Sequence, residues 1–253
     1  MLQIAAVSYL NTQPYLLGIR KYLSVNHTVE VYDPKRCTEM LKCGKANVGL
    51  IPTATLSELK NVVPISDYGI VAYGRVYSVS LYSQVPIQKI STIFLDYQSR
   101  TSIALAQILC QNYWKIKPKF IEAYPGYEAQ IQGNQAGVII GDRAIILKTA
   151  YQYDFDLAQA WYEYTQLPFV FALWVVDKKL YSSELHSLLN YAFEKGIQDR
   201  RNYYAQWAAQ HQIDEQTVSL YLDKYIHYTI SAEAKQGLSL FLDKLCCVAT
   251  RLD

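Results

Sequence analysis

The sequence predicts an α/β protein of two lobes, and the pattern of strand and helix signals is the main evidence. Short apolar runs at 2–7, 29–32 and 48–52 alternate with helical patterns in the first third of the chain. Such alternation indicates βαβ units and a mainly parallel sheet. The same theme returns over residues 92–164, so we expect a second lobe with its own sheet.

The first lobe is expected to begin as three strand and helix pairs. The expected strands are 2–7, 29–32 and 48–52, and the expected helices are 13–23, 37–43 and 54–59. Three further strand signals follow at 62–65, 68–72 and 76–83. They leave room only for turns, so these strands must be antiparallel or lead the chain elsewhere. We therefore expect the chain to cross into the second lobe at 83–86.

The second lobe is expected to span about 80 residues, a size that suits a compact unit. Its expected strands are 92–95, 119–121 and 137–140, and its expected helices are 101–113, 127–132 and 156–164. The apolar run 167–176 predicts a buried strand that returns the chain to the first lobe. Apolar residues at spacings of three and four then predict only helices, at 180–208, 214–225 and 231–245.

The predicted domains are residues 1–85 with 167–253 as a discontinuous first lobe, and residues 86–166 as the second lobe. Two lobes joined by two crossings, with C-terminal helices closing on the first lobe, describe a periplasmic-binding-protein-like (type II) architecture. In that architecture a ligand cleft lies between the lobes.

Composition excludes several kinds of partner. The chain has 253 residues, 51% hydrophobic and 18% charged, as in an ordinary globular protein. Its net charge is only +2 and its Lys and Arg residues are spread out, so we expect no nucleic-acid partner. The N-terminal apolar run is too short for a signal-peptide core, and no later run approaches the roughly 18 residues of a membrane span, so we expect no membrane partner. The oligomeric state is unknown from these features.

The sequence lacks the common catalytic motifs. It contains no G-x-G-x-x-G, G-x-x-x-x-G-K-[ST], G-x-S-x-G or H-E-x-x-H. Its four histidines are scattered without ligand partners at metal spacing, so no metal site and no cofactor are predicted. Its five cysteines include no C-x-x-C pair, which favours reduced thiols in a cytoplasmic protein.

Three polar motifs follow predicted strands directly. They are Ser8-Tyr9-Leu10-Asn11, Ser99-Arg100-Thr101-Ser102 and Gly141-Asp142. Ligands of open α/β sheets bind at the carboxyl ends of strands. Backbone N–H groups at helix starts, helped by the helix dipole, favour a carboxylate or phosphate there. The motifs therefore predict a small-anion site in the cleft.

Each motif also has a purely structural interpretation. Asn11 suits an ordinary N-cap before a helix, and the alternative is an amide that points into the cleft. The Ser99 motif is either a helix cap or a carboxylate cradle. Asp142 either caps the next helix or orients a basic neighbour such as Arg143. Ser78, after the possible turn at Gly74, is expected at the hinge.

Together these residues carry a family resemblance. The relevant segments are Ala6-Val7-Ser8-Tyr9-Leu10-Asn11-Thr12, Gly74-x-Val76-x-Ser78, Leu95-Asp96-x-x-Ser99-Arg100-Thr101-Ser102, Ile139-Ile140-Gly141-Asp142-x-Ala144, and Asp156-Leu157-Ala158-x-Ala160-Trp161 ahead of Leu167-Pro168-Phe169-Val170-Phe171-Ala172. In this order they resemble the chorismate dehydratase family of menaquinone biosynthesis. The resemblance spans the first 175 residues or so, and the C-terminal helices add no motif to it.

The resemblance implies a cytoplasmic lyase of the futalosine route. It would convert chorismate to 3-[(1-carboxyvinyl)oxy]benzoate and water, without a cofactor. By the family's pattern Asn11 and Ser78 face the reacting centre. The implied substrate-binding residues are Ser8, Tyr9, Gly74, Ser99, Arg100, Thr101, Ser102, Gly141 and Asp142, of which Ser99, Thr101 and Ser102 hold a carboxylate. No His or Glu in the motifs is an obvious base, and one hypothesis gives that role to the enolpyruvyl carboxylate of the substrate.

Three other functions remain alternatives at this point. One is the related lobed enzyme that makes dihydroxynaphthoate later in the same pathway, although the first turn at Ser8 to Asn11 favours the dehydratase. Another is a solute-binding protein, which the absence of a secretion signal and a lipid-attachment cysteine disfavours. The last is an intracellular effector-binding module, for which no DNA-binding segment is evident.

Overall fold

The computed structural model describes residues 1–249 and divides them into two compact units. Unit 1 consists of Met1–Val71 and Val170–Ser231. Unit 2 consists of Ala72–Phe169 and the segment that begins at Ala232. Both units are therefore discontinuous in sequence, and the described chain passes from one to the other three times.

Unit 1 is built on a six-stranded mixed sheet. Its strands, in spatial order, are β11 (His227–Thr229), β4 (Val62–Ala72), β10 (Phe169–Asp177), β3 (Val48–Pro52), β1 (Leu2–Val7) and β2 (His27–Tyr32). Strand β1 lies parallel to both β2 and β3, as the βαβ pattern predicts. Strand β10 is antiparallel to β3, and β11 is antiparallel to β4.

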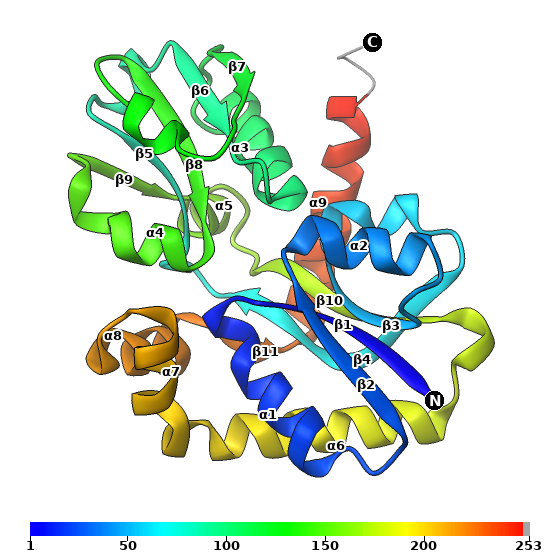
Figure 1. Cartoon of the computed structure of the whole chain (residues 1–253). Coiled ribbons are helices and arrows are strands. Elements are labelled where there is room, and N and C mark those ends of the chain that lie inside the picture. Colours follow the sequence, from blue (N-terminus) through cyan, green and yellow to red (C-terminus); the bar gives the residue numbers. More distant parts are fainter. Residues whose placement is uncertain (250–253) are drawn as a thin grey trace. The chain divides into compact units, whose positions relative to one another are not determined.

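Helices cover both faces of this sheet, with α2 on one side and α1 and α6 on the other (Figure 1). The helices of unit 1 are α1 (Gln13–Tyr22), α2 (Pro34–Lys42), α6 (Ser183–Asp199), α7 (Tyr204–His211) and α8 (Glu215–Leu220). Helices α1 and α6 touch through glycines, since a Cβ added at Gly18 would lie 2.0 Å from the Ala192 oxygen. The rings of Tyr15, Trp174 and Phe193 pack in the core between α1, α6 and the sheet.

Unit 2 contains a five-stranded mixed sheet. Its strands, in spatial order, are β7 (Lys119–Glu122), β6 (Thr92–Leu95), β8 (Gln135–Ile140), β5 (Val79–Ser83) and β9 (Tyr153–Asp156). Strand β6 is parallel to β7 and β8, whereas β5 is antiparallel to β8 and β9. Because β6 and β8 are parallel neighbours, the helices that follow them begin at the same edge of the sheet.

The helices of unit 2 are α3 (Arg100–Asn112), α4 (Gly141–Leu147), α5 (Leu157–Thr165) and α9 (Ala232–Ala249). Helix α3 packs against both α5 and α9 (Figure 1). The Phe241 ring of α9 lies edge-on to Trp161 and Phe169, at centroid distances of 6.3 and 4.9 Å. A Cβ added at Gly237 would lie 2.0 Å from the Pro168 oxygen, so α9 also touches the backbone before β10.

The structure differs from the predicted domain boundaries of 1–85, 86–166 and 167–253 in two places. Strand β5 belongs to unit 2, because it pairs with β8 and β9 and all its residues are buried there. The crossing therefore precedes β5 and does not lie at 83–86. Helix α9 also belongs to unit 2, since its apolar face packs on α3 and α5.

Several local predictions were also wrong. The signals at 62–65 and 68–72 form the single strand β4, and the predicted helices 54–59 and 127–132 are short 3-10 turns. The region after residue 177 is not entirely helical, because β11 adds a strand beside β4. The predicted helix 180–208 is interrupted by a 3-10 turn at Arg200–Tyr203.

Candidate functional site

The first motif lies in unit 1, where β1 ends. The Ser8 N–H donates to the Tyr32 carbonyl at 2.9 Å, which extends the β1 and β2 pairing by one residue. A short 3-10 turn, Leu10–Thr12, then leads into α1, which has Pro14 in its first turn. Ser8 is exposed and Tyr9 is partly exposed, whereas Asn11 is buried.

Asn11 is held by its side chain and does not cap the helix. The N-cap residue of α1 is Thr12, and it makes no side-chain cap hydrogen bond. The Asn11 amide donates from Nδ2 to the Tyr221 hydroxyl at 3.0 Å, and its Oδ1 accepts from the Thr12 hydroxyl at 3.2 Å. The Tyr228 hydroxyl donates to the Asn11 carbonyl at 3.1 Å. The cap interpretation of Asn11 is therefore wrong, and its amide has a fixed orientation.

The Ser99 motif lies in unit 2, at the start of α3. Ser99 is the N-cap residue, and its hydroxyl accepts from the Ser102 N–H at 3.0 Å, which confirms the cap interpretation. This does not exclude anion binding, because a hydroxyl that accepts one hydrogen bond can still donate another. Thr101 and Ser102 are both 2% exposed, and Arg100 is exposed. The start of α3 thus gathers three hydroxyls and a cation where the helix dipole favours an anion.

Ser78 lies at the end of a turn that precedes β5, and it is 1% exposed. The Ser78 carbonyl accepts from the Gly141 N–H at 2.8 Å, so the turn is tied to the first residue of α4. Gly74 and Gly141 both adopt positive φ, at +79° and +64°, which favours glycine at these positions. The N-cap position of α4 is Ile140, so Asp142 in the first helical turn is not the cap residue.

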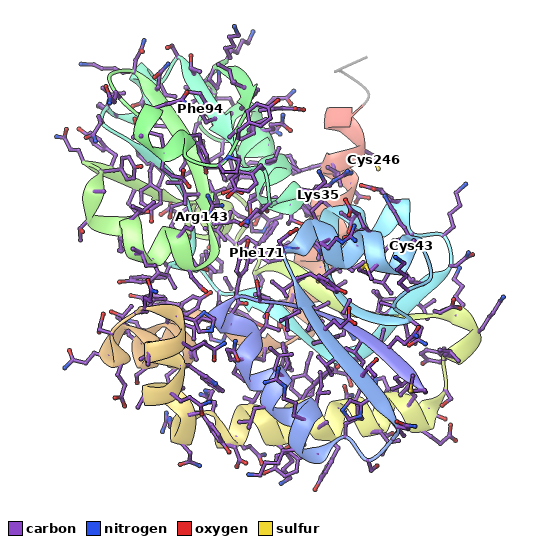
Figure 2. All side chains as sticks on the ribbon, in the orientation of Figure 1. Lys35, Cys43, Phe94, Arg143, Phe171 and Cys246 are labelled. Atoms are coloured by element: carbon purple, nitrogen blue, oxygen red, sulfur yellow. The ribbon has the colours of Figure 1, made fainter. Side chains whose placement is uncertain are left out.

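An ion pair joins two of the unit 2 motifs. The Arg143 guanidinium of α4 donates at 2.5 Å to the carboxylate of Asp96, which follows β6, and also contacts Glu128 and Gln98. Figure 2 labels Arg143 on the ribbon of α4. Burial raises the pKa of the Asp96 carboxyl, while the Arg143 charge and the Tyr127 hydroxyl oppose that change. The pair therefore joins the segment after β6 to the first turn of α4.

Sequence reasoning missed two residues that hold the candidate catalytic groups. Tyr221 lies 210 positions from the Asn11 amide that it binds, and nothing in the pattern connects them. Asp156 belongs to a motif that carries the resemblance, but its contact with the turn before Ser78 spans 79 and 80 positions. Burial raises the pKa of the Asp156 carboxyl, and backbone donors together with the Arg75 charge oppose that effect.

The motifs thus form two clusters. In unit 1, Ser8 and Tyr9 adjoin the fixed amide of Asn11. In unit 2, the segments that contain Gly74, Ser78, Ser99 to Ser102, Gly141 and Asp142 are joined through the Ser78 carbonyl and the Arg143 ion pair. Both clusters offer amide, hydroxyl and backbone donors, a chemistry that suits carboxylates.

Two further observations concern the described chain. Among residues 1–249, no three His, Cys, Asp or Glu side chains lie close enough together to hold a metal ion. In the same part of the chain, no helix has the length and apolar character needed to cross a bilayer.

Comparison with known proteins decides the family. A family model described as menaquinone biosynthesis matches residues 2–246. The chain belongs to this menaquinone-biosynthesis family. Among curated relatives, the chorismate dehydratase of Campylobacter jejuni is 28% identical over 251 residues, covering 95% of each chain. The chorismate dehydratase of Thermus thermophilus is 25% identical over 195 residues, which cover 66% of this chain and 71% of the relative.

Solved structures confirm the predicted fold of this family member. A protein of Archaeoglobus fulgidus superposes with a TM-score of 0.76 at 11% identity and covers 98% of each chain. The periplasmic aliphatic sulphonate binding protein of Escherichia coli superposes with a TM-score of 0.65 at 15% identity, covering 99% of this chain and 87% of its own. At such low identity these similarities establish the fold, which is periplasmic-binding-protein-like.

Proposed function

We propose that this protein is a chorismate dehydratase, which eliminates water from chorismate to give 3-[(1-carboxyvinyl)oxy]benzoate. The observation that carries the proposal is the family match over residues 2–246, together with a named relative that aligns over 95% of the chain. The donor-rich clusters around Asn11 and Ser78 support it, because chorismate is a dicarboxylate with a hydroxyl leaving group.

The reaction needs only modest catalytic groups from the protein. Loss of the C3 proton and the C4 hydroxyl turns the ring of chorismate into an aromatic ring, so a large driving force resides in the substrate. Catalysis can then rest on orientation and on donors aimed at the developing charge. We assign these roles to Asn11 and Ser78, which orient the substrate and polarise the leaving hydroxyl.

The start of α3 supplies the second part of the proposal. Hydroxyls at Ser99, Thr101 and Ser102 surround the first turn of a 13-residue helix. Helix starts favour anions through their N–H groups and dipole, so we assign a carboxylate of chorismate to this position. The exposed Arg100 adds a positive charge to the same turn. Ser8, Tyr9, Gly74, Gly141 and Asp142 are assigned to substrate binding by family resemblance.

We assign proton removal to the enolpyruvyl carboxylate of the substrate. The two buried carboxylates nearest the unit 2 motifs are already engaged in contacts within the protein. Asp96 is paired with Arg143, and Asp156 accepts backbone N–H groups at two places. Asp156 already accepts from four backbone N–H groups, and Asp96 accepts from Arg143, the Tyr127 hydroxyl and the Gln98 N–H, so the acceptor positions of both carboxylates are largely occupied.

We place the reaction in the futalosine route to menaquinone and in the cytoplasm. The route follows from the family resemblance. Free thiols at Cys37, Cys43, Cys110 and Cys246 support a reducing compartment.

The first experiment incubates purified, metal-free protein with chorismate and follows the products by chromatography and mass spectrometry. We expect loss of one water from chorismate at a rate proportional to enzyme concentration. Unchanged chorismate would refute the proposal. Samples would then be tested for dihydroxynaphthoate formation and for thermal shifts with other small carboxylates, the outcomes expected of the two main alternatives.

The second experiment tests the assigned roles. In Asn11→Ala and Ser78→Ala we expect kcat to fall about a hundredfold or more, with KM changed only a few-fold, because both donors act mainly in the transition state. Matched controls are Asn190→Ala, which removes a hydrogen-bonded amide elsewhere in unit 1, and Ser83→Ala, which removes a buried hydroxyl in β5. Wild-type kcat in either test variant would refute the role of that residue.

A further inference from the structure

The turn before Ser78 contains a strained residue. Tyr77 adopts a φ of +70°, the left-handed region that bulky side chains avoid. A strained backbone persists only where surrounding contacts hold it, and such residues cluster at functional sites. Tyr77 is the immediate neighbour of Ser78, and β5 begins at the next residue, Val79. The conformation of Tyr77 therefore sets the direction in which the Ser78 side chain leaves the backbone.

One carboxylate binds the backbone N–H groups of Val76 and Tyr77. Asp156 Oδ2 accepts from the Tyr77 N–H at 2.7 Å and from the Val76 N–H at 3.0 Å. Asp156 Oδ1 accepts from the N–H groups of Ala158 and Gln159, both at 3.1 Å, as the N-cap of α5. One buried side chain thus joins the start of α5 to a turn about 80 positions away.

The Tyr77 side chain is held separately. Lys148 Nζ lies 4.0 Å from the centre of the Tyr77 ring, a cation–π distance. The same Lys148 and the neighbouring Arg75 both donate to Asp154, at 2.7 and 2.5 Å. Arg75 Nε also lies 3.8 Å from Asp156 Oδ2. These contacts surround the turn with charged groups from β9, from Lys148 directly after α4, and from Arg75 in the turn itself.

We propose that Asp156 is a positioning residue for Ser78, which acts by holding Tyr77 in its left-handed conformation. This inference rests on the proposed catalytic role of Ser78. The cap on α5 alone would need only the hydrogen bonds to Ala158 and Gln159. The additional pair to Val76 and Tyr77 has no use in α5 and fixes the turn that carries Ser78.

Asp156→Ser separates the two functions of the carboxylate. Serine is a good N-cap and keeps the start of α5, but it is too short to hold the turn as well. We expect kcat to fall about tenfold or more while KM changes only a few-fold. The control is Asp33→Ser, which changes the N-cap of α2 in unit 1, where the carboxylate accepts from the Arg36 N–H at 2.9 Å. We expect the control to keep wild-type kcat.

A rescue experiment tests the proposed route from Asp156 to Ser78. Tyr77→Gly removes the steric cost of positive φ, so the turn no longer needs to be held. We expect Tyr77→Gly added to Asp156→Ser to recover kcat several-fold, although Tyr77→Gly added to wild-type protein does not raise it. Recovery of kcat without a change in thermal midpoint is a result that a purely structural role would not produce.

The outcomes are distinguishable. Wild-type kcat in folded Asp156→Ser, or a kcat loss that Tyr77→Gly does not recover, overturns this inference while Ser78→Ala remains impaired. Wild-type kcat in Ser78→Ala overturns the proposed role of Ser78 itself. If Asp156→Ser fails to fold, Asp156→Asn is used in its place, because it keeps the volume of the side chain and loses acceptor capacity on one side.

Discussion

The hydroxyl of Tyr221 is expected to matter for catalysis because it orients Asn11. It accepts from Asn11 Nδ2 at 3.0 Å, and Tyr221 is 1% exposed. Tyr221→Phe keeps the ring and removes only the acceptor, which leaves a buried amide N–H without this partner. An unsatisfied buried donor costs about 1–3 kcal/mol. If the amide must keep its orientation in the transition state, this corresponds to a fall in kcat of about 5- to 150-fold.

The assay is a double-mutant cycle with chorismate as substrate. We expect Tyr221→Phe combined with Asn11→Ala to have the same kcat as Asn11→Ala alone, because the hydroxyl acts through the amide. Tyr204→Phe is the matched control, since its hydroxyl donates to Asp223 at 2.7 Å in the same unit. We expect that control to lower the thermal midpoint but not kcat.

Two results would refute this reasoning. Wild-type kcat in Tyr221→Phe would show that the amide keeps its place without the hydroxyl. Fully additive losses in the double variant would show that Tyr221 acts on the reaction independently of Asn11.

Three further predictions concern stability and thiol reactivity. Gly18→Ala should lower the free energy of unfolding in urea by about 2 kcal/mol or more, because its Cβ would lie 2.0 Å from a backbone oxygen of α6. Gly44→Ala is the comparison: it has open space around its Cβ but a φ of +71°, and it should lower the free energy of unfolding by about 1 kcal/mol. Arg143→Met should cost on the order of 3 kcal/mol at pH 8, because a buried carboxylate loses its charged partner. This loss of stability should become smaller as the pH falls, because burial raises the pKa of the Asp96 carboxyl and protonation then removes the unpaired charge. An equal loss of stability in urea unfolding at pH 5 and pH 8 would contradict this prediction. Burial raises the pKa of the Cys37 thiol to about 12, so iodoacetamide at pH 8 should label exposed Cys43 much faster in mass-spectrometric mapping, and equal rates would be inconsistent with the structure.

Much of the fold could be predicted because it rests on local signals. The strands β1, β3 and β6 were predicted at their observed bounds, since each is a short apolar run next to turn residues. Strand β11 could not be predicted, because three residues carry no periodicity and the strand exists only through its pairing with β4. The sheet to which β5 belongs was also predicted wrongly, because its apolar pattern fits either sheet and only its pairing with β8 and β9 distinguishes the two.

The candidate site was likewise predictable where its signals are local and unpredictable where they depend on distant contacts. The predicted placement of three polar motifs after strands is confirmed at β1, β6 and β8, since that position depends on local order along the chain. The residues that hold them could not be found, because the contacts of Tyr221 with Asn11 and of Asp156 with the turn before Ser78 are made only after distant segments fold together. An isolated sequence has no periodicity or spacing that encodes such pairs.

The position of α9 in unit 2 has a consequence for the order in which the protein can fold during its synthesis. Translation completes β11, the last strand of unit 1, before it reaches Phe241 of α9. Until then, Trp161 and Phe169 lack the ring that covers them in the finished core. The nascent chain therefore completes unit 1 first and carries an open apolar face on unit 2. That face is where a chaperone would bind, or where aggregation would begin, if elongation stalled before α9.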